Sequence, residues 1–448
     1  MLKNYLKLAI KVLGRKKFFT FISLFGISFT LMILMLVTSF LETEFGDYPP
    51  LSEKDKMVFV PRVALRNVVT DTIPAIDSSL VSGKMVYDTT YSYKERNASM
   101  SSSSAGYALL DKHLRKLQKV EKYSFYSSGT SFDIFLHSNK LTFEAVYTDK
   151  SFWDIFDFEF VEGQSYTENQ VQNQEQVIVI SDRAAREYFG RDQGLVGEEI
   201  FVNNKHFKIL GVVKQVSSRE ETIAGQLYIP LFEIGEDDLK RQSFLGSFNA
   251  VFMGKDKTSL PLILADIERI AESTAPVGYK SSNAKFNTLE IMAFSFFERY
   301  ACDFVSESDP KKGVRLFLTV LISLLTLFVL LPTLNLININ ISRIMERSAE
   351  IGVRKAFGAD SGNILFQFVF ENVILTFIGG LIGFALALVL LSVINGSQVL
   401  GDTVLSFNFK IFFFSILICL LFGILSGLIP AYKMSKIHIV NALKQNQL

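Results

Sequence analysis

Four stretches of the chain contain no charged residue: 18–41, 316–342, 372–401 and 411–432. Each is longer than the ~20 residues that an α-helix needs to cross a hydrocarbon core of ~30 Å. A core helix of a soluble protein rarely stays apolar on every face over such a length. The pattern predicts a membrane protein with transmembrane helices at 18–41, 316–342, 361–395 and 411–432.

The basic residues near the ends of these stretches predict the orientation of the helices. Lysine and arginine are enriched on the cytoplasmic side of membrane proteins. Basic residues precede the first stretch, separate the second from the third and follow the fourth: Lys3, Lys7, Lys11, Arg15, Lys16, Lys17, Arg343, Arg347, Arg354, Lys355, Lys433, Lys436 and Lys444. The lead 1–17, the segment 343–360 and the tail 433–448 are therefore expected in the cytoplasm, which puts both chain ends inside. The first stretch is too long for a cleaved signal peptide and has no small-residue cleavage site, so we interpret it as an uncleaved anchor.

The segment 42–310 is expected to be a folded α+β domain outside the cell, inserted between the first two helices. Alternating or continuous apolar patterns predict strands at 177–180, 226–231 and 248–252. A helix is expected to follow the first of these strands and to end near Phe189, with Ser181 or Asp182 as its cap. Further elements are a hairpin at 199–213 that turns at Asn203–Asn204, an amphipathic helix at 260–272, and a polar loop at 99–105.

Composition and motifs argue against several classes of function. The net charge of +1 gives no reason to expect nucleic acid as a partner. The chain has neither a catalytic GxSxG motif nor the HExxH or CxxC spacing of a metal site. Cys302 and Cys419 lie beside or within apolar stretches, so no disulfide between them is expected. We expect a non-catalytic chain that holds no metal or cofactor.

The short segment between the second and third spans carries both signs of charge. On a helix, Ile344 and Ile351 would share one face, and Glu350 and Arg354 would form an ion pair of the favourable order. Gly358 could end this helix in a left-handed conformation. Such a helix is either an interfacial linker with snorkelling bases or a docking element for a cytoplasmic partner, and these residues alone do not separate the two.

Polar and small residues in the third and fourth stretches suggest further roles. A carboxylate at membrane depth, such as Glu371, is a functional candidate, unless the start of the third helix is still interfacial. The spacings of Gly379 with Gly383 and of Gly423 with Gly427 are typical of close helix packing, within one chain or across a dimer.

Several parts of the chain resemble FtsX/MacB-type ABC permeases. The segment NLININISRIMERSAEIGVRKAFGA from Asn335 is similar to the family's signature, in which a span ends in Asn and an E-R-x-x-E-I-G-x-R block follows. The tail from Gly427 to Lys444 matches the family's closing pattern less strictly, because Ser435 and Val440 depart from it. The opening of the chain and the segment 177–213 also resemble the family. The matching residues of the signature are Glu346, Arg347, Glu350, Ile351, Gly352, Arg354, Ala356, Gly358 and Ala359.

The resemblance implies a permease that acts as a homodimer, or as a heterodimer with a related permease, in the bacterial inner membrane. The segment 343–358 would be the coupling helix that sits on a dimeric ATPase. Because the sequence has no GxxxxGK[ST] loop, ATP and Mg are expected on a separate ATPase chain. A periplasmic adaptor and an outer-membrane channel would complete an efflux system. The residues assigned to ATPase coupling are Arg343, Glu346, Arg347, Glu350, Ile351, Gly352, Arg354, Lys355 and Gly358.

Three functions remain open at this point. The leading hypothesis is export or extraction of a substrate, as in MacB-like efflux or lipoprotein release. The second is FtsX-like signalling that activates a cell-wall hydrolase. The third is a membrane receptor or adhesin that needs no ATPase.

Overall fold

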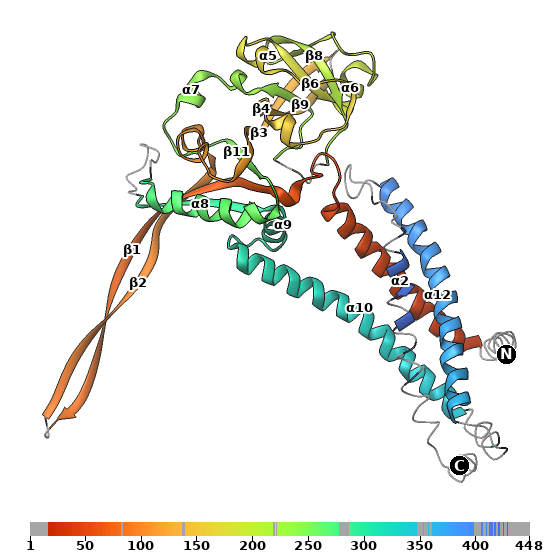
Figure 1. The fold of residues 1–448 in the computed structure, drawn as a ribbon. Helices are drawn as coiled ribbons and strands as arrows, with labels where there is room; N and C mark the ends of the chain where they lie inside the picture. The colour runs from red at the N-terminus through yellow and green to blue at the C-terminus, as the bar shows by residue number, and fades with distance from the viewer. Residues whose placement is uncertain are drawn as a thin grey trace. The chain divides into compact units, whose positions relative to one another are not determined.

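The computed structural model describes residues 17–81, 84–136, 139–217, 220, 222–276, 286–346, 353, 357 and 361–397, with scattered positions between 405 and 428. The chain divides into two compact units. One is Asp47–Phe317, and the other is Met1–Gly46 together with Leu318–Leu448. The first unit is a mixed α+β domain, and the described part of the second is helical (Figure 1).

Long apolar helices form the described part of the helical unit. They are α2 (Lys17–Phe45), α12 (Ser361–Ser397) and the continuation of α10 (Pro310–Glu346), whose first residues belong to the α+β unit. Two stretches, Thr20–Phe45 and Val369–Ser397, are long and apolar enough to cross a membrane, with mean hydropathies of 2.3 and 2.7.

These helices cover much of what the charge pattern predicts. The expected spans at 18–41, 316–342 and 361–395 lie within α2, α10 and α12. The expected fourth span at 411–432 falls outside the described residues, apart from scattered positions. The same holds for the tail 433–448 and for the lead before Lys17, and the predicted topology of these parts stays a prediction.

A twelve-stranded sheet organises the α+β unit, in the order β10-β2-β1-β11-β3-β4-β9-β6-β8-β5, with β12 beside β1 and β7 beside β8. Most neighbours are antiparallel, whereas β4 with β9 and β6 with β8 are parallel. The strands are β1 (Met57–Val81), β2 (Lys84–Ala105), β3 (Val120–Leu136), β4 (Asn139–Thr148), β5 (Phe160–Gly163), β6 (Val177–Ser181), β7 (Glu199–Val202), β8 (Lys205–Val213), β9 (Leu227–Pro230), β10 (Leu245–Gly246), β11 (Phe248–Gly254) and β12 (Thr288–Ser295).

Short helices cover this sheet and close its ends. The core between them is continuous, and every residue of β6 and β11 is buried. Ile263, Ile267 and Ala271 form the buried face of α8, which packs on β12, β1 and β11. The helices are α3 (Tyr107–Leu109), α4 (Phe152–Ile155), α5 (Glu168–Gln172), α6 (Asp182–Phe189), α7 (Glu236–Lys240), α8 (Leu260–Ser273) and α9 (Phe296–Val305), with single turns at Lys54–Lys56, Leu110–Leu114, Leu231–Ile234 and Lys257–Ser259.

Several elements confirm the sequence analysis of this domain. β6 leads into α6, and the hydroxyl of Ser181 accepts a hydrogen bond from the backbone N–H of Ala184 as its N-cap. β7 and β8 form the expected hairpin, with Asn203 and Asn204 at positive φ in the turn. The expected strands at 226–231 and 248–252 and the helix at 260–272 correspond to β9, β11 and α8.

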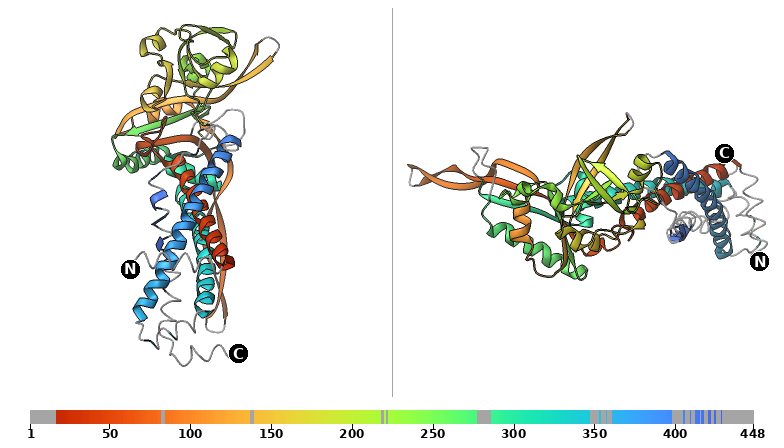
Figure 2. Two further views of the ribbon diagram at one scale, coloured as in Figure 1. Left: turned by 90° about the vertical axis from the view of Figure 1, so that its right-hand side faces the viewer. Right: turned by 90° about the horizontal axis from the view of Figure 1, so that it is seen from above.

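A long hairpin of β1 and β2 projects from the sheet as a two-stranded arm (Figures 1 and 2). The prediction of a polar loop at 99–105 was wrong, because these residues are the end of β2, where 99–103 pair with β1 and 104–105 pair with β10. Ser101, for example, lies opposite Leu65, whose side chain is buried in the core. The burial of the partner strand and the backbone ladder hold the serine-rich segment extended, despite its polar side chains.

Candidate functional site

The end of the α+β domain that leads into α10 contains a connected set of polar and aromatic side chains. α9 begins directly after β12, and Ser295 and Glu298 form a capping box across this boundary. The Glu298 carboxylate accepts hydrogen bonds from the backbone N–H and the hydroxyl of Ser295, both at 2.8 Å. Because β12 pairs with β1 over Arg62–Arg66, the start of α9 is fixed to the sheet.

α9 and the first turns of α10 form a tight corner, which we call the elbow (residues 296–317). Ser306 ends α9 in the left-handed conformation, with φ 53°. Asp309 then caps α10, because its carboxylate accepts hydrogen bonds from the backbone N–H groups of Lys311 (2.9 Å) and Lys312 (3.2 Å). These amides, that of Lys312 most strongly, hold the pKa of Asp309 below its usual value.

Two contacts fasten α10 to α9 within the elbow. A β-carbon built on Gly313 would lie 2.5 Å from the Sγ of Cys302, so only glycine allows this approach. The Phe317 side chain is buried among Phe297, Tyr300 and Phe304, with ring centroids 5.3–6.0 Å apart. The first two turns of α10 therefore pack as part of the α+β domain.

Arg299 joins α9 to the connection between β8 and β9, of which residues 214–217, 220 and 222–226 are described; these described residues are called the loop 214–226. Its guanidinium lies 2.5 Å from the Glu220 carboxylate, and only 11% and 17% of the two side chains are exposed. The guanidinium also stacks 4.5 Å from the ring centroid of Phe59 on β1. A buried ion pair of this kind is costly to break from one side, because the remaining charge has no equivalent partner.

Hydroxyl groups extend this cluster toward the core. The hydroxyl of Thr222 lies 3.4 Å both from Arg299 Nη1 and from the Tyr126 hydroxyl on β3. Burial raises the pKa of Tyr126 to about 12, so the phenol stays protonated. Lys54 is also buried, and its Nζ lies 4.7 Å from the centroid of the Phe296 ring.

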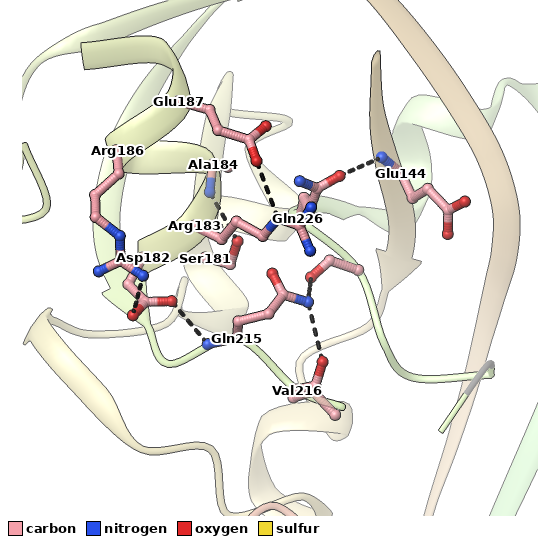
Figure 3. A network of polar contacts seen from close by, with 11 residues as sticks. Glu144, Ser181, Asp182, Arg183, Ala184, Arg186, Glu187, Gln215, Val216 and Gln226 are labelled. Carbon is pink, nitrogen blue, oxygen red and sulfur yellow. Dashed lines mark hydrogen bonds and ion pairs between the residues drawn. The ribbon is translucent and has the colours of Figure 1, made fainter. Parts of the chain in front are cut away.

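The two ends of the loop 214–226 make hydrogen bonds to α6 and to β4 (Figure 3). The backbone N–H of Gln215 donates to the Asp182 carboxylate at 2.9 Å. At the other end, the Gln226 side chain accepts a hydrogen bond from the backbone N–H of Glu144 on β4, at 3.2 Å. The described ends of this loop thus contact α6 and β4, and Glu220 contacts Arg299 on α9.

The structure places few of the residues assigned to ATPase coupling. Arg343 and Glu346 are described, and both lie in the last turn of α10. The remaining ones, Arg347, Glu350, Ile351, Gly352, Arg354, Lys355 and Gly358, lie outside the described residues. Their role stays a prediction.

Gly379 and Gly383 lie where α12 contacts α2. A β-carbon on Gly379 would meet the Ile27 side chain at 2.7 Å, and one on Gly383 would meet the backbone carbonyl of Ser28 at 2.6 Å. The contact is thus within one chain, and the helices run in the same direction. Gly423 and Gly427 fall outside the described residues.

Glu371 lies near the start of the apolar stretch of α12 rather than at its centre. Its side chain is 2% exposed, and its carboxylate accepts a hydrogen bond from Gln367 at 3.1 Å. Asn372 and Thr376 on the same helix are also buried. Glu371 therefore belongs to a small buried polar group at the start of the apolar stretch, and its role in function stays a prediction.

The sequence analysis missed the residues of the elbow and the Arg299–Glu220 pair. No motif marks them, and the ion pair joins positions 79 residues apart. One local signal was present: Ser295 followed by Glu298 before an aromatic run matches a capping box. Within the described part of the chain, no group of three His, Cys, Asp or Glu side chains is arranged to hold a metal ion.

Comparison with known proteins identifies both units. The profile of the MacB-like periplasmic core domain matches residues 20–270, and that of the FtsX-like permease C-terminal domain matches residues 322–439. The chain is similar to the uncharacterized ABC transporter permease YknZ of Bacillus subtilis (strain 168), with 26% identity over 63% of this chain and 65% of that protein. It is also similar to the macrolide export ATP-binding/permease protein MacB of Bdellovibrio bacteriovorus, with 26% identity over 63% of this chain and 41% of the relative.

Solved structures of such domains include the periplasmic region of MacB from Actinobacillus actinomycetemcomitans. It is 17% identical, aligns with 44% of this chain and 80% of its own length, and gives a TM-score of 0.31. The alignments with YknZ and the Bdellovibrio protein span less than two thirds of each relative's length. The two profile matches together cover most of the sequence, and the chain belongs to the family of ABC transporter permeases that combine a MacB-like periplasmic core domain with an FtsX-like permease domain.

Proposed function

We propose that this permease passes the ATP-driven motion of a separate ATPase subunit to its extracytoplasmic domain, for export or extraction of a substrate. The observation that carries the proposal is the continuity of α10, a single helix of 37 residues from Pro310 to Glu346. Its length is about 55 Å, from the rise per residue of an α-helix. A helix of this length can act as a rod that joins the elbow to the segment at 343–360.

At its far end, the rod leads into the segment that resembles the family's coupling helix. Residues 343–360 would rest on the ATPase, with Glu350 and Arg354 as polar contacts. Closure of the ATPase dimer on ATP and Mg would then push on the end of α10. The ATP-binding groups in this proposal belong to the partner chain.

At its near end, the rod is held by the elbow. Gly313 and Phe317 fix α10 to α9, and Ser295 fixes α9 to β12. Arg299 passes the movement to Glu220 and thereby to the loop 214–226. These contacts support a path from the membrane helix to both the sheet and the lobe around α6.

The wider assembly in this proposal follows the predicted topology. Four spans would anchor the chain in the bacterial inner membrane with both ends in the cytoplasm, as a homodimer or a heterodimer. A periplasmic adaptor and an outer-membrane channel would receive the substrate. Similar proteins include a macrolide export ATP-binding/permease protein and a pyoverdine export ATP-binding/permease protein, which favours efflux as the form of transport.

Two classes of variant test the two ends of the rod in the full-length protein, reconstituted with its ATPase in nanodiscs. The double variant Glu350→Arg, Arg354→Glu is expected to lose the ATPase in co-purification. Arg299→Met is expected to keep the ATPase but to lose the nucleotide-dependent change in Trp153 fluorescence. Trp153 is suited to this measurement because it is the only tryptophan of the chain and lies in the α+β domain.

Arg183→Met is the matched control, because Arg183 pairs with Glu187 on the exposed face of α6. It should behave as wild type in both measurements. If the coupling variant still retains the ATPase and its stimulated activity, the proposed function is wrong. If Arg299→Met responds to nucleotide like wild type, motion does not pass through α9.

A further inference from the structure

The arm formed by β1 and β2 has two different edges. The side chain of Asn287 forms hydrogen bonds with both the backbone N–H and the carbonyl of Val68. From Val68 to the tip of the arm, the described residues of β1 and β2 pair only with each other. The β1 edge contains Pro74, which removes a backbone donor. β2 contains no proline between Lys84 and Ala105, so its edge keeps every N–H group.

Proteins usually protect such an edge with charges, prolines or bulges. In β2 the protecting features all lie before Ser99. Lys94, Glu95 and Arg96 are charged, and Ala98 is an extra, bulged residue where the register with β1 shifts. The following residues, Ser99–Ser103, have small uncharged or apolar side chains in regular pairing with β1. We call this segment the open edge.

The fold itself already uses the continuation of this edge. β10 pairs antiparallel with Ala105 and Ser104, on the far side of β2 from β1. Among the described strands, none continues this pairing along Ser103 to Ser99. A further strand could therefore extend the sheet in line with β10.

A hollow of about 350 Å³ lies beside the open edge. Ser101 and Ser103 line it from β2, with Tyr107, Asp238, Arg241 and Ser243 on its other sides. Ser99 has the same strand parity as Ser101 and Ser103, and its buried hydroxyl has no hydrogen-bond partner within the described residues. The hollow thus offers hydroxyl groups and one ion pair, between Arg241 and Asp238 at 3.0 Å.

We propose that the open edge, Ser99–Ser103, binds an extended segment of an extracytoplasmic partner protein as an added strand. The main chain of the segment pairs with β2, and alternate side chains enter the hollow. Because the hollow combines hydroxyl groups with the apolar residues Leu245 and Phe248, it suits a side chain with an apolar ring and a polar tip, such as Tyr. A second copy of β2 is a poorer occupant, because antiparallel pairing of two open edges would present only serine and methionine side chains, and no aromatic ring, to this space.

The test uses a displayed library of nine-residue peptides, selected against the full-length protein in nanodiscs. The selected peptide is then labelled, and its affinity is measured by fluorescence anisotropy. Methylation of alternate backbone nitrogens should weaken binding at least tenfold in one of the two frames, since those N–H groups pair with β2. Ser101→Lys and Ser103→Lys should each weaken binding at least tenfold, because lysine fills the hollow and protects the edge.

Ser92→Lys is the matched control on the same strand, outside the open edge, and should change the affinity less than twofold. Protection of the Ser99–Ser103 amides from hydrogen exchange on binding would support the proposal independently of the variants. Selection of no peptide, or binding unaffected by both methylation frames or by Ser101→Lys, would overturn it. A disulfide between two copies of Ser101→Cys in membranes would also overturn it, because the occupant would then be a second copy.

Discussion

Gly313 on α10 lies against Cys302 on α9 so closely that an added β-carbon would be 2.5 Å from the Sγ atom and 3.2 Å from the Cα atom. Gly313→Ala is therefore expected to destabilise the domain by about 1–3 kcal/mol, the usual cost of overpacking. Cys302→Ala in the same chain should restore part of this loss. The midpoint of urea unfolding, followed by Trp153 fluorescence, measures both effects.

Lys311→Ala, at an exposed position of the same helix, is the control for Gly313→Ala and should leave the midpoint nearly unchanged. Equal midpoints for Gly313→Ala and wild type would mean that the elbow is looser than the structure shows. In that case α10 could not move as one body with α9.

Arg299 and Glu220 should depend on each other energetically. Arg299→Met leaves the Glu220 carboxylate without its ion-pair partner in a largely buried place, which should cost about 3–5 kcal/mol. Replacing Glu220 by methionine as well should recover much of that cost, because no unpaired charge remains. A double-mutant cycle on the urea midpoints gives the coupling energy, and an additive result would contradict the pairing.

The contact between α12 and α2 predicts an effect in the helical unit. Gly383→Ala would place a methyl group 2.6 Å from the carbonyl oxygen of Ser28, so the helices must separate. We expect a loss of about 1–3 kcal/mol, seen as a lower temperature of aggregation of the detergent-solubilised protein. Gly396→Ala is the matched control on α12, because nothing lies within 4 Å of its added carbon; a similar loss there would rule out the packing explanation.

The cap of α10 predicts a dependence on pH. Bonds from the backbone amides of Lys312 and Lys311 lower the pKa of Asp309 in the folded state. Its contribution to stability is therefore complete above the unfolded pKa of about 3.9 and is lost as the pH falls through the lower, folded value. We measure the urea midpoint of unfolding as a function of pH. Asp309→Asn should reduce the fall of the midpoint at acidic pH and leave its pH dependence near neutral pH as in wild type. An unchanged fall at acidic pH would exclude Asp309 as its source.

The sequence predicted those parts of the fold whose signals are local. The apolar run of β6 with the Ser181 cap, the Asn203–Asn204 turn and the amphipathic face of α8 each depend on neighbours in the chain. The serine-rich end of β2 was missed because its strand conformation comes from pairing with the buried residues of β1, which no local pattern shows.

In the candidate site, too, the sequence predicted the features with local signals and missed those that depend on long-range contacts. The glycine spacing at Gly379 and Gly383 indicated close packing but could not say which helix approaches, since that depends on the fold of the whole unit. The Arg299–Glu220 pair is long-range in sequence, and no local pattern predicts that Glu220 contacts α9. The coupling residues from Arg347 to Gly358 stay a prediction from their resemblance to a family signature.

The two hydrogen bonds between the Asn287 side chain and the Val68 backbone mark the point where the arm leaves the sheet. Beyond that point, each residue pair of β1 and β2 adds to the length of the arm and not to the hydrophobic core. Removing or adding residues in matched sets of two on each strand would keep the pleat in phase. The length of the arm in this chain can therefore be changed by such paired insertions or deletions without altering the buried core of the domain.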